Sequence, residues 1–196
     1  MSALPDLTAD FRALDEIVEA QPEGVIAEIA HGVYMMSPRP RLRHSRVQVR
    51  LSHILEAALG EPHGATPPDW LFAIEPELRS EKAFSRVVPD LAGWRRSTSG
   101  WPSLEENPVT LAPEWVAEIL SPSTERFDRG PKRDAYGLMS IGSLWLVDAE
   151  ARRVETYANV RGRMVAGPVL AEEDALASAP FAGARDLTEL VASLFL

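Results

Sequence analysis

The chain has 196 residues, of which 45% are hydrophobic and 25% charged, and its formal net charge is −9. This length and composition suit one globular domain over residues 1–196, and the absence of cysteine excludes disulfides and thiolate metal sites. No run approaches the roughly 18 apolar residues of a membrane span, and residues 1–10 lack a signal peptide, so we expect a cytoplasmic protein that binds no membrane.

The first third of the chain predicts a helix, a hairpin and a second helix, over residues 9–20, 25–29 with 33–36, and 42–59. Thr8 is expected to cap the first helix, because its hydroxyl can accept a hydrogen bond from a free backbone N–H. The hairpin is expected to turn at His31 and Gly32. The second helix repeats apolar residues on one face and is expected to end at Gly60.

The rest of the chain predicts strands over residues 71–78, 87–94 and 115–121, a loop over 97–110, a helix over 129–141, a hairpin over 144–147 and 154–157, and a last helix that Asp186 caps. Helices and strands interleave without the regular βαβ rhythm of a doubly wound sheet. We therefore expect an α+β fold in which helices flank a mixed central β-sheet.

Two carboxylates interrupt apolar strands, Asp90 in the strand predicted over 87–94 and Glu118 in the strand predicted over 115–121. An ionised carboxylate is costly to bury, and two on adjacent strands repel each other unless a cation lies between them. A divalent metal answers both charges, and the carbonyl of Ile119 adds a third hard oxygen ligand, which suits Mg²⁺ or Mn²⁺. The alternative explanation for Glu118 is a buried ion pair with Lys132 or Arg133.

A metal at this position would serve phosphodiester hydrolysis, because it activates water, polarises the phosphoryl oxygen and orients the attack. Lys132 would position the water and offset charge in the transition state. His44 would hold a phosphate or assist proton transfer. A solvated surface histidine is an equally good interpretation of His44.

A second feature is a run of basic residues in a chain that is acidic overall. Arg43, Arg46 and Arg50 are spaced so that they lie near one another on the second helix. With His44 they predict a positive strip that contacts DNA phosphates. The alternative is a solvated helix face, and the acidic balance of the whole chain counts against nonspecific adhesion to nucleic acid.

Residues 113–124 and 128–133 resemble the signature of a bacterial family described as putative restriction endonucleases, the Uma2-type family of the PD-(D/E)XK nuclease superfamily. The segments around His44 and Asp90 resemble its upstream motifs. The resemblance implies a mixed sheet flanked by helices, a metal at Asp90 and Glu118, and a homodimer. The superfamily's simplest pattern has a lysine where this chain has Leu120, but this family supplies it from the next helix, which points to Lys132.

The sequence therefore predicts a metal-dependent endodeoxyribonuclease whose substrate is DNA. One alternative is a phosphodiesterase that acts on RNA or branched DNA. Another is a nucleic-acid-binding or regulatory protein that keeps the fold without turnover. The presence of Asp90, Glu118 and Lys132 together favours the enzyme, whereas the acidic balance slightly favours the protein without turnover.

Overall fold

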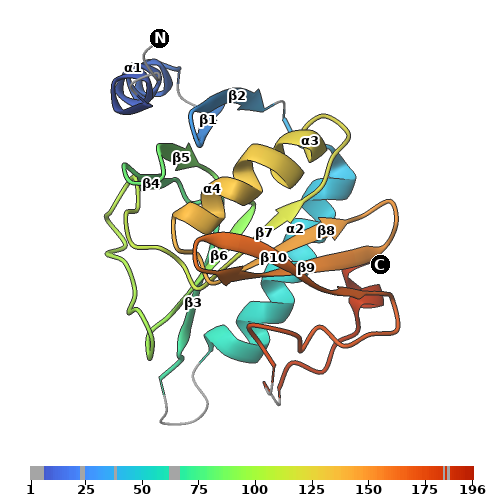
Figure 1. The fold of residues 1–196 in the computed structure, drawn as a ribbon. Coiled ribbons are helices and arrows are strands. Elements are labelled where there is room, and N and C mark those ends of the chain that lie inside the picture. Colours follow the sequence, from blue (N-terminus) through green and yellow to red (C-terminus); the bar gives the residue numbers. More distant parts are fainter. Residues whose placement is uncertain (1–6, 23–24, 38, 62–66, 183, 185) are drawn as a thin grey trace.

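The computed structural model describes residues 7–196 except 23–24, 38, 62–66, 183 and 185. A six-stranded sheet with the order β10-β9-β8-β7-β6-β3 forms its centre (Figure 1). Its strands are β3 Trp70–Ile74, β6 Leu91–Arg95, β7 Trp115–Ile119, β8 Ser143–Asp148, β9 Arg153–Val160 and β10 Arg163–Leu170. β7 and β8 pair in parallel and the other neighbours are antiparallel, so the expected mixed sheet is confirmed.

A second sheet of four strands, which the sequence did not predict, has the order β2-β1-β5-β4. Its strands are β1 Ile26–Ala30, β2 Val33–Ser37, β4 Leu78–Ser80 and β5 Ser85–Val87. The hairpin of β1 and β2 is confirmed, and His31 and Gly32 both take the positive φ that a tight hairpin turn requires. Helix α1, Leu7–Glu19, packs on this sheet through Phe11 and Val18. Because α1 begins at Leu7, the predicted N-cap at Thr8 is wrong.

Helices cover both faces of the central sheet. Helix α2, Leu42–Leu55, continues through the turn η1, Glu56–Gly60, and packs on one face. The helical segment 125–138 packs on the other face and consists of α3 Glu125–Phe127, η2 Asp128–Lys132 and α4 Arg133–Leu138. Successive strand residues point to opposite faces. Trp115 and Ile119 of β7 therefore face α2, and Val116 faces the helical segment.

The chain crosses between the two sheets at two adjacent corners. The strand predicted over residues 87–94 is wrong, because β5 ends at Val87 and β6 begins at Leu91. Pro89 between them has no N–H to donate to a ladder. The strand predicted over 71–78 also breaks, at Glu75, whose φ is 51°. The Glu75 N–H donates to the Asp90 carbonyl at 3.2 Å, so Asp90 lies at the junction of the two sheets.

Three further predictions, for two helices and a hairpin, are confirmed only in part or are wrong. The helix predicted over 129–141 begins at Glu125 and ends at Leu138. The hairpin of β8 and β9 is confirmed, but β10 was not expected. The helix predicted after Asp186 is wrong, because only the 3₁₀ turn η3, Val191–Phe195, forms there. Among the described residues, no helix has the length and apolar character needed to cross a bilayer.

Candidate active site

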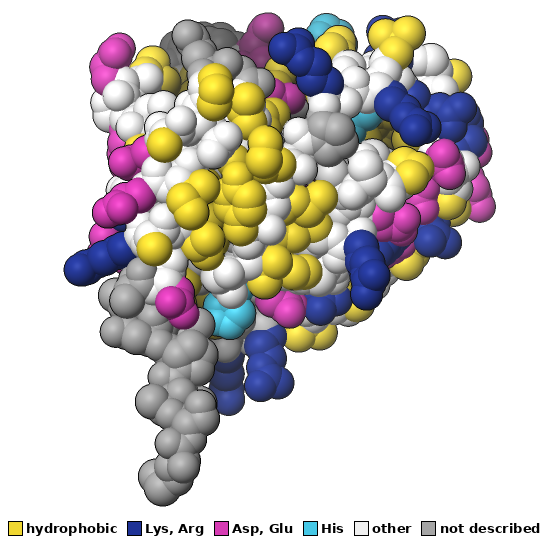
Figure 2. All heavy atoms as spheres, turned by 90° about the horizontal axis from the view of Figure 1, so that it is seen from above, with side chains coloured by type: hydrophobic (Ala, Val, Ile, Leu, Met, Phe, Trp, Pro, Cys, Tyr) yellow, Lys and Arg dark blue, Asp and Glu magenta, His cyan; other side chains and the backbone are white. Residues whose placement is uncertain are grey.

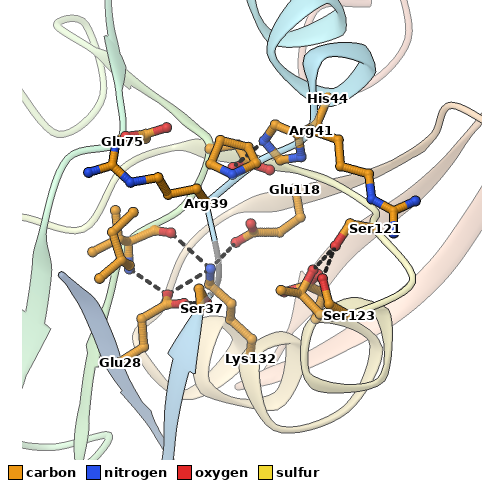
Figure 3. Close-up of a pocket in the computed structure, with 16 residues that line it drawn as sticks. Glu28, Ser37, Arg39, Arg41, His44, Glu75, Glu118, Ser121, Ser123 and Lys132 are labelled. Carbon is orange, nitrogen blue, oxygen red and sulfur yellow. Dashed lines mark hydrogen bonds and ion pairs between the residues drawn. The ribbon is translucent and has the colours of Figure 1, made fainter. Parts of the chain in front are cut away.

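A pocket of about 240 Å³ opens where the two sheets, the start of α2 and the helical segment 125–138 meet (Figure 3). Asp90, Glu118, Lys132 and His44 all line it. These are the four residues for which the sequence predicts catalytic roles, and three separate elements and one corner bring them together. Their roles in catalysis stay predictions.

The carboxylate of Asp90 is held from two sides. Its Oδ2 accepts a hydrogen bond from the backbone N–H of Ile119 at 2.6 Å, and its Oδ1 lies 3.1 Å from Nε2 of His44. The Asp90 carbonyl also accepts from the amide of Gln48 at 3.0 Å. The end of β7 and the first turns of α2 therefore fix the orientation of Asp90.

The imidazole of His44 belongs to this site rather than to a solvated helix face, because its side chain is only 13% exposed. Burial lowers the pKa of His44, but the hydrogen bond and charge of Asp90 and a hydrogen bond to the Ile119 backbone outweigh it and raise the pKa above its ordinary value. The protonated imidazole is thereby stabilised beside Asp90.

Lys132 lines the pocket and is deeply buried, with a side chain that is 3% exposed. Its Nζ lies 3.0 Å from Oε1 of Glu118 and 2.7 Å from Oε1 of Glu28, and it donates to the Val88 carbonyl at 2.8 Å. The hydroxyl of Tyr136 donates a hydrogen bond to the same oxygen of Glu118. Three acceptors thus meet the three protons of the ammonium group.

The pocket contains more carboxylates than cations. Burial and the neighbouring acids raise the pKa of Glu118 well above its ordinary value, although Lys132 opposes this. Burial also raises the pKa of Asp128 to about 6. Burial lowers the pKa of Lys132, but the acids around it raise the pKa overall, so it stays charged. The surplus of negative charge would be relieved by a further cation.

The donor chemistry of the pocket fits Mg²⁺ or Mn²⁺. Asp90 and Glu118 line the pocket and offer carboxylate oxygens, whereas Ile119 is not among the described residues that line it, and its backbone hydrogen-bonds to His44. Among the described residues, no group of three or more His, Cys, Asp or Glu side chains is arranged to hold a metal. Mg²⁺ usually takes one or two carboxylates from a protein and completes its shell with water and substrate phosphates.

Sequence reasoning missed Glu28, which is the second carboxylate on Lys132. Its Oε1 also accepts from the Val88 N–H at 2.8 Å, and its Oε2 accepts from the Ser37 hydroxyl at 3.2 Å. Glu28 lies between apolar neighbours on β1, which is the same signal that singled out Glu118. Asp128 and Tyr136 were also given no role, although both belong to the part of the sequence that resembles the family's motif.

The arginines lie differently from the predicted strip. Nε of Arg46 donates to the Leu196 carbonyl at 3.3 Å, and Nε of Arg50 donates to the Ser193 carbonyl at 3.1 Å. Both side chains therefore contact the C-terminal segment, while Arg43 is exposed. The pocket is instead lined by Arg39 and Arg41. A role in DNA binding for Arg43, Arg46 and Arg50 stays a prediction.

Comparison with known proteins gives one family and one solved structure of note. The model of the Uma2 family, described as a putative restriction endonuclease, matches residues 8–189. The crystal structure of a putative nuclease belonging to DUF820 from Anabaena variabilis ATCC 29413 superposes with a TM-score of 0.70 and 21% sequence identity, covering 93% of this chain and 96% of that chain. At this identity the likeness shows the shared fold alone. The comparison with curated proteins gives no match.

Proposed function

Because the chain belongs to the Uma2 family of putative restriction endonucleases, we propose that it is a metal-dependent endodeoxyribonuclease that hydrolyses phosphodiester bonds in DNA. The observation that supports this best is the meeting of Asp90, Glu118, Lys132 and His44 around one pocket. The same proposal includes a single nuclease-like domain over residues 1–196 and a cytoplasmic location.

Asp90, Glu118 and the carbonyl of Ile119 would hold Mg²⁺ or Mn²⁺. Such an ion supplies an activated water and offsets charge on the phosphate. The chain's own contribution is to fix the ligands in advance. The Ile119 N–H and His44 orient Asp90, and Tyr136 and Lys132 orient Glu118. A ligand that is already oriented needs little rearrangement when the substrate arrives.

Lys132 and His44 would act on the substrate itself. The ammonium group of Lys132 places a permanent positive charge beside Glu118, where it can offset negative charge that develops on the phosphate. The imidazole of His44 favours its protonated form beside Asp90. It is therefore suited to hold a phosphate oxygen, and we assign it this role in preference to proton transfer.

A nicking assay on supercoiled plasmid tests the proposal, with Mg²⁺ and Mn²⁺ in separate reactions. The wild type should convert the plasmid to nicked and linear forms, and Asp90→Asn and Glu118→Gln should lose roughly 100-fold or more of this activity. Circular dichroism controls for folding. If Asp90→Asn and Glu118→Gln both cleave the plasmid as fast as the wild type, the proposed site is wrong. Cleavage of RNA or branched DNA in place of plasmid would favour the phosphodiesterase alternative.

One observation supports the alternative without turnover. Lys132 is fully engaged by Glu28, Glu118 and the Val88 carbonyl, as in an ion cluster that serves the fold. A protein of this kind would bind nucleic acid and cleave none of the substrates with either metal. The nicking assay combined with a binding measurement on the wild type separates the two functions.

We further propose that the expected homodimer forms through β2, the edge strand of the small sheet. Figure 2 shows apolar side chains gathered on the face seen from above, where Figure 1 places α1 and the β1–β2 hairpin. Val33 and Met36 are 46% and 53% exposed on β2, the edge strand, and Ile17 and Val25 are exposed nearby. Exposed apolar edge strands tend to pair with another chain.

Light scattering after size exclusion tests this dimer. The wild type should have twice the monomer mass, and the double variant Val33→Lys, Met36→Lys should have the mass of a monomer with an unchanged circular dichroism spectrum. Val160→Lys, on an exposed position of β9, is the matched control and should remain a dimer. A monomeric wild type, or a double variant that stays dimeric, would refute this interface.

A further inference from the structure

Two arginines at the opening of the pocket have no assigned role. Arg39 and Arg41 lie in the connection between β2 and α2, and both are exposed and line the pocket. Within the part of the chain that the structure describes, neither side chain has a hydrogen bond or ion pair. In this they differ from Arg46 and Arg50, whose side chains are bound to carbonyls of the C-terminal segment.

The two guanidinium groups lie on opposite sides of the opening. Figure 3 shows that Arg39 extends toward the side on which Glu75 lies, whereas Arg41 extends toward Ser121. Glu118 and Lys132 lie between these two sides and deeper in the pocket. A chain of phosphates that passes from one guanidinium to the other would therefore cross the candidate active site.

Charge explains why such contacts would be needed. The floor of the pocket carries Glu28, Asp90, Glu118 and Asp128, and the whole chain has a net charge of −9. Lys132 offsets only part of this negative charge, so further cations at the rim would help to hold a phosphodiester there. A guanidinium group suits this purpose, because it stays charged and can form two parallel hydrogen bonds to one phosphate.

The Arg41 side of the rim adds neutral donors. The hydroxyl of Ser121 lies 2.9 Å from the hydroxyls of Ser123 and of Thr124, and all three residues line the pocket. Hydroxyl groups can donate to phosphate oxygens as well as accept. Guanidinium and hydroxyl groups are common partners of phosphate oxygens, so we expect the contacts to be with the sugar–phosphate backbone.

We propose that Arg39 and Arg41 bind the two backbone phosphates that flank the scissile phosphate of one strand. This inference rests on the proposed nuclease function and adds the part of the substrate that is recognised, which is the backbone irrespective of base sequence. The strand crosses the opening from the Glu75 side to the Ser121 side. Affinity then depends on Arg39 and Arg41 to the same extent for unrelated DNA sequences.

Fluorescence anisotropy tests the proposal with two end-labelled DNA duplexes of unrelated sequence, in Ca²⁺ to prevent cleavage and over a range of salt concentrations. The double variant Arg39→Gln, Arg41→Gln should bind both duplexes more weakly. The slope of log affinity against log salt should become shallower by about 0.9 for each phosphate that the variant no longer neutralises. In the cleavage assay KM should rise while kcat at saturating DNA stays unchanged.

Two comparison variants make the result specific. Arg161→Gln, Arg163→Gln removes the same charge from exposed positions at the start of β10 and outside the pocket, so it controls for net charge. Arg46→Gln, Arg50→Gln tests the strip that the sequence predicts, and it should weaken binding less than the change at Arg39 and Arg41. Thermal melts check that each variant folds.

The possible outcomes separate this inference from the nuclease function. A wild type that binds neither duplex overturns both. Wild-type binding that the change at Arg39 and Arg41 leaves unaltered, or that the Arg161 and Arg163 control reduces equally, overturns the inference alone. A loss of affinity for only one of the two duplexes overturns the claim that the backbone is recognised.

Discussion

Strand β7 contributes to two interiors of opposite chemistry. Toward α2, Trp115 packs edge-on against Trp145 and Phe181, with ring centroids 5.5 and 5.3 Å apart. Toward the helical segment 125–138, Glu118 meets Lys132 and the hydroxyl of Tyr136. Alternate residues of one strand thus enter an aromatic cluster and a buried ion cluster.

The two interiors affect folding and function differently. Burial of aromatic surface stabilises the fold, and edge-to-face pairs add roughly 0.5–1.5 kcal/mol each. Burial of the ion cluster removes several charges from water, which costs free energy. Such clusters are therefore often no more stabilising than apolar side chains of the same volume. The aromatic face therefore holds β7 in place, whereas the charged face would serve the metal and substrate that the proposed function assigns to it.

The largest effect on stability and activity is expected where two buried carboxylates lose the cation that pairs with them. Lys132→Ala removes the cation from Glu118 and Glu28, and loss of one partner of a buried pair typically costs about 3–5 kcal/mol. Cleavage should fall roughly 100-fold or more, while Mn²⁺ binding persists because Lys132 is not a ligand. Urea unfolding, a nicking assay and calorimetry with Mn²⁺ measure the three quantities. Unchanged turnover would refute a catalytic role for Lys132.

A substitution in the aromatic cluster is expected to reduce stability by a similar amount without reducing the rate of cleavage. Phe181→Ala leaves a cavity beside Trp70, Trp115 and Trp145 and should cost about 3–5 kcal/mol of unfolding free energy. Well below the melting temperature, kcat should match that of the wild type. If kcat falls as far as in Lys132→Ala, the two faces are not independent and the comparison fails.

The ion cluster, unlike the aromatic cluster, should make the stability of the protein depend on pH. Burial raises the pKa of Asp128 from 3.8 to about 6. The folded state therefore holds this proton more tightly, and stability is lost as the pH rises from about 4 to about 6. Asp128→Asn should flatten that part of the curve and stabilise the metal-free protein at neutral pH by at most about 3 kcal/mol. Urea unfolding across this range measures it, and a variant that is less stable at neutral pH would contradict the assignment.

The smallest expected effect concerns the metal. Asn at position 90 can accept the hydrogen bond from the Ile119 N–H through its amide oxygen, and its NH₂ group can donate to Nε2 of His44 once this imidazole is neutral. The change also removes a charge that repels Glu118, so Asp90→Asn should be at least as stable as the metal-free wild type. In the wild type, Mn²⁺ at 100 times its dissociation constant should add about 2.7 kcal/mol. The variant should lose this gain in thermal melts. A full gain in Asp90→Asn would mean that the metal binds elsewhere.

Local patterns in the sequence were enough to predict the hairpin of β1 and β2, the apolar face of α2 and the proximity of Asp90 and Glu118 at one pocket. The failures involve contacts between distant parts of the chain. Pro89 indicates that a strand can end within residues 87–94, but nothing in this segment indicates that β5 joins a second sheet. Strand β10 contains Gly167 and Pro168, which argue against a strand on local grounds. Glu28 approaches Lys132 only after both sheets have formed.

The place of β7 in the sheet has a consequence for hydrogen exchange. The strand is paired on both edges, in parallel with β8 and antiparallel with β6, and it is covered on both faces. Its amide protons can exchange only when the whole sheet opens, whereas exposed connections exchange through small local fluctuations. The Glu118 amide should therefore be among the slowest to exchange. The amides of Arg39 and Arg41, in an exposed connection, should be among the fastest. The backbone at Glu118, a proposed metal ligand, would then open far more rarely than the backbone at Arg39 and Arg41, which we propose to bind the substrate.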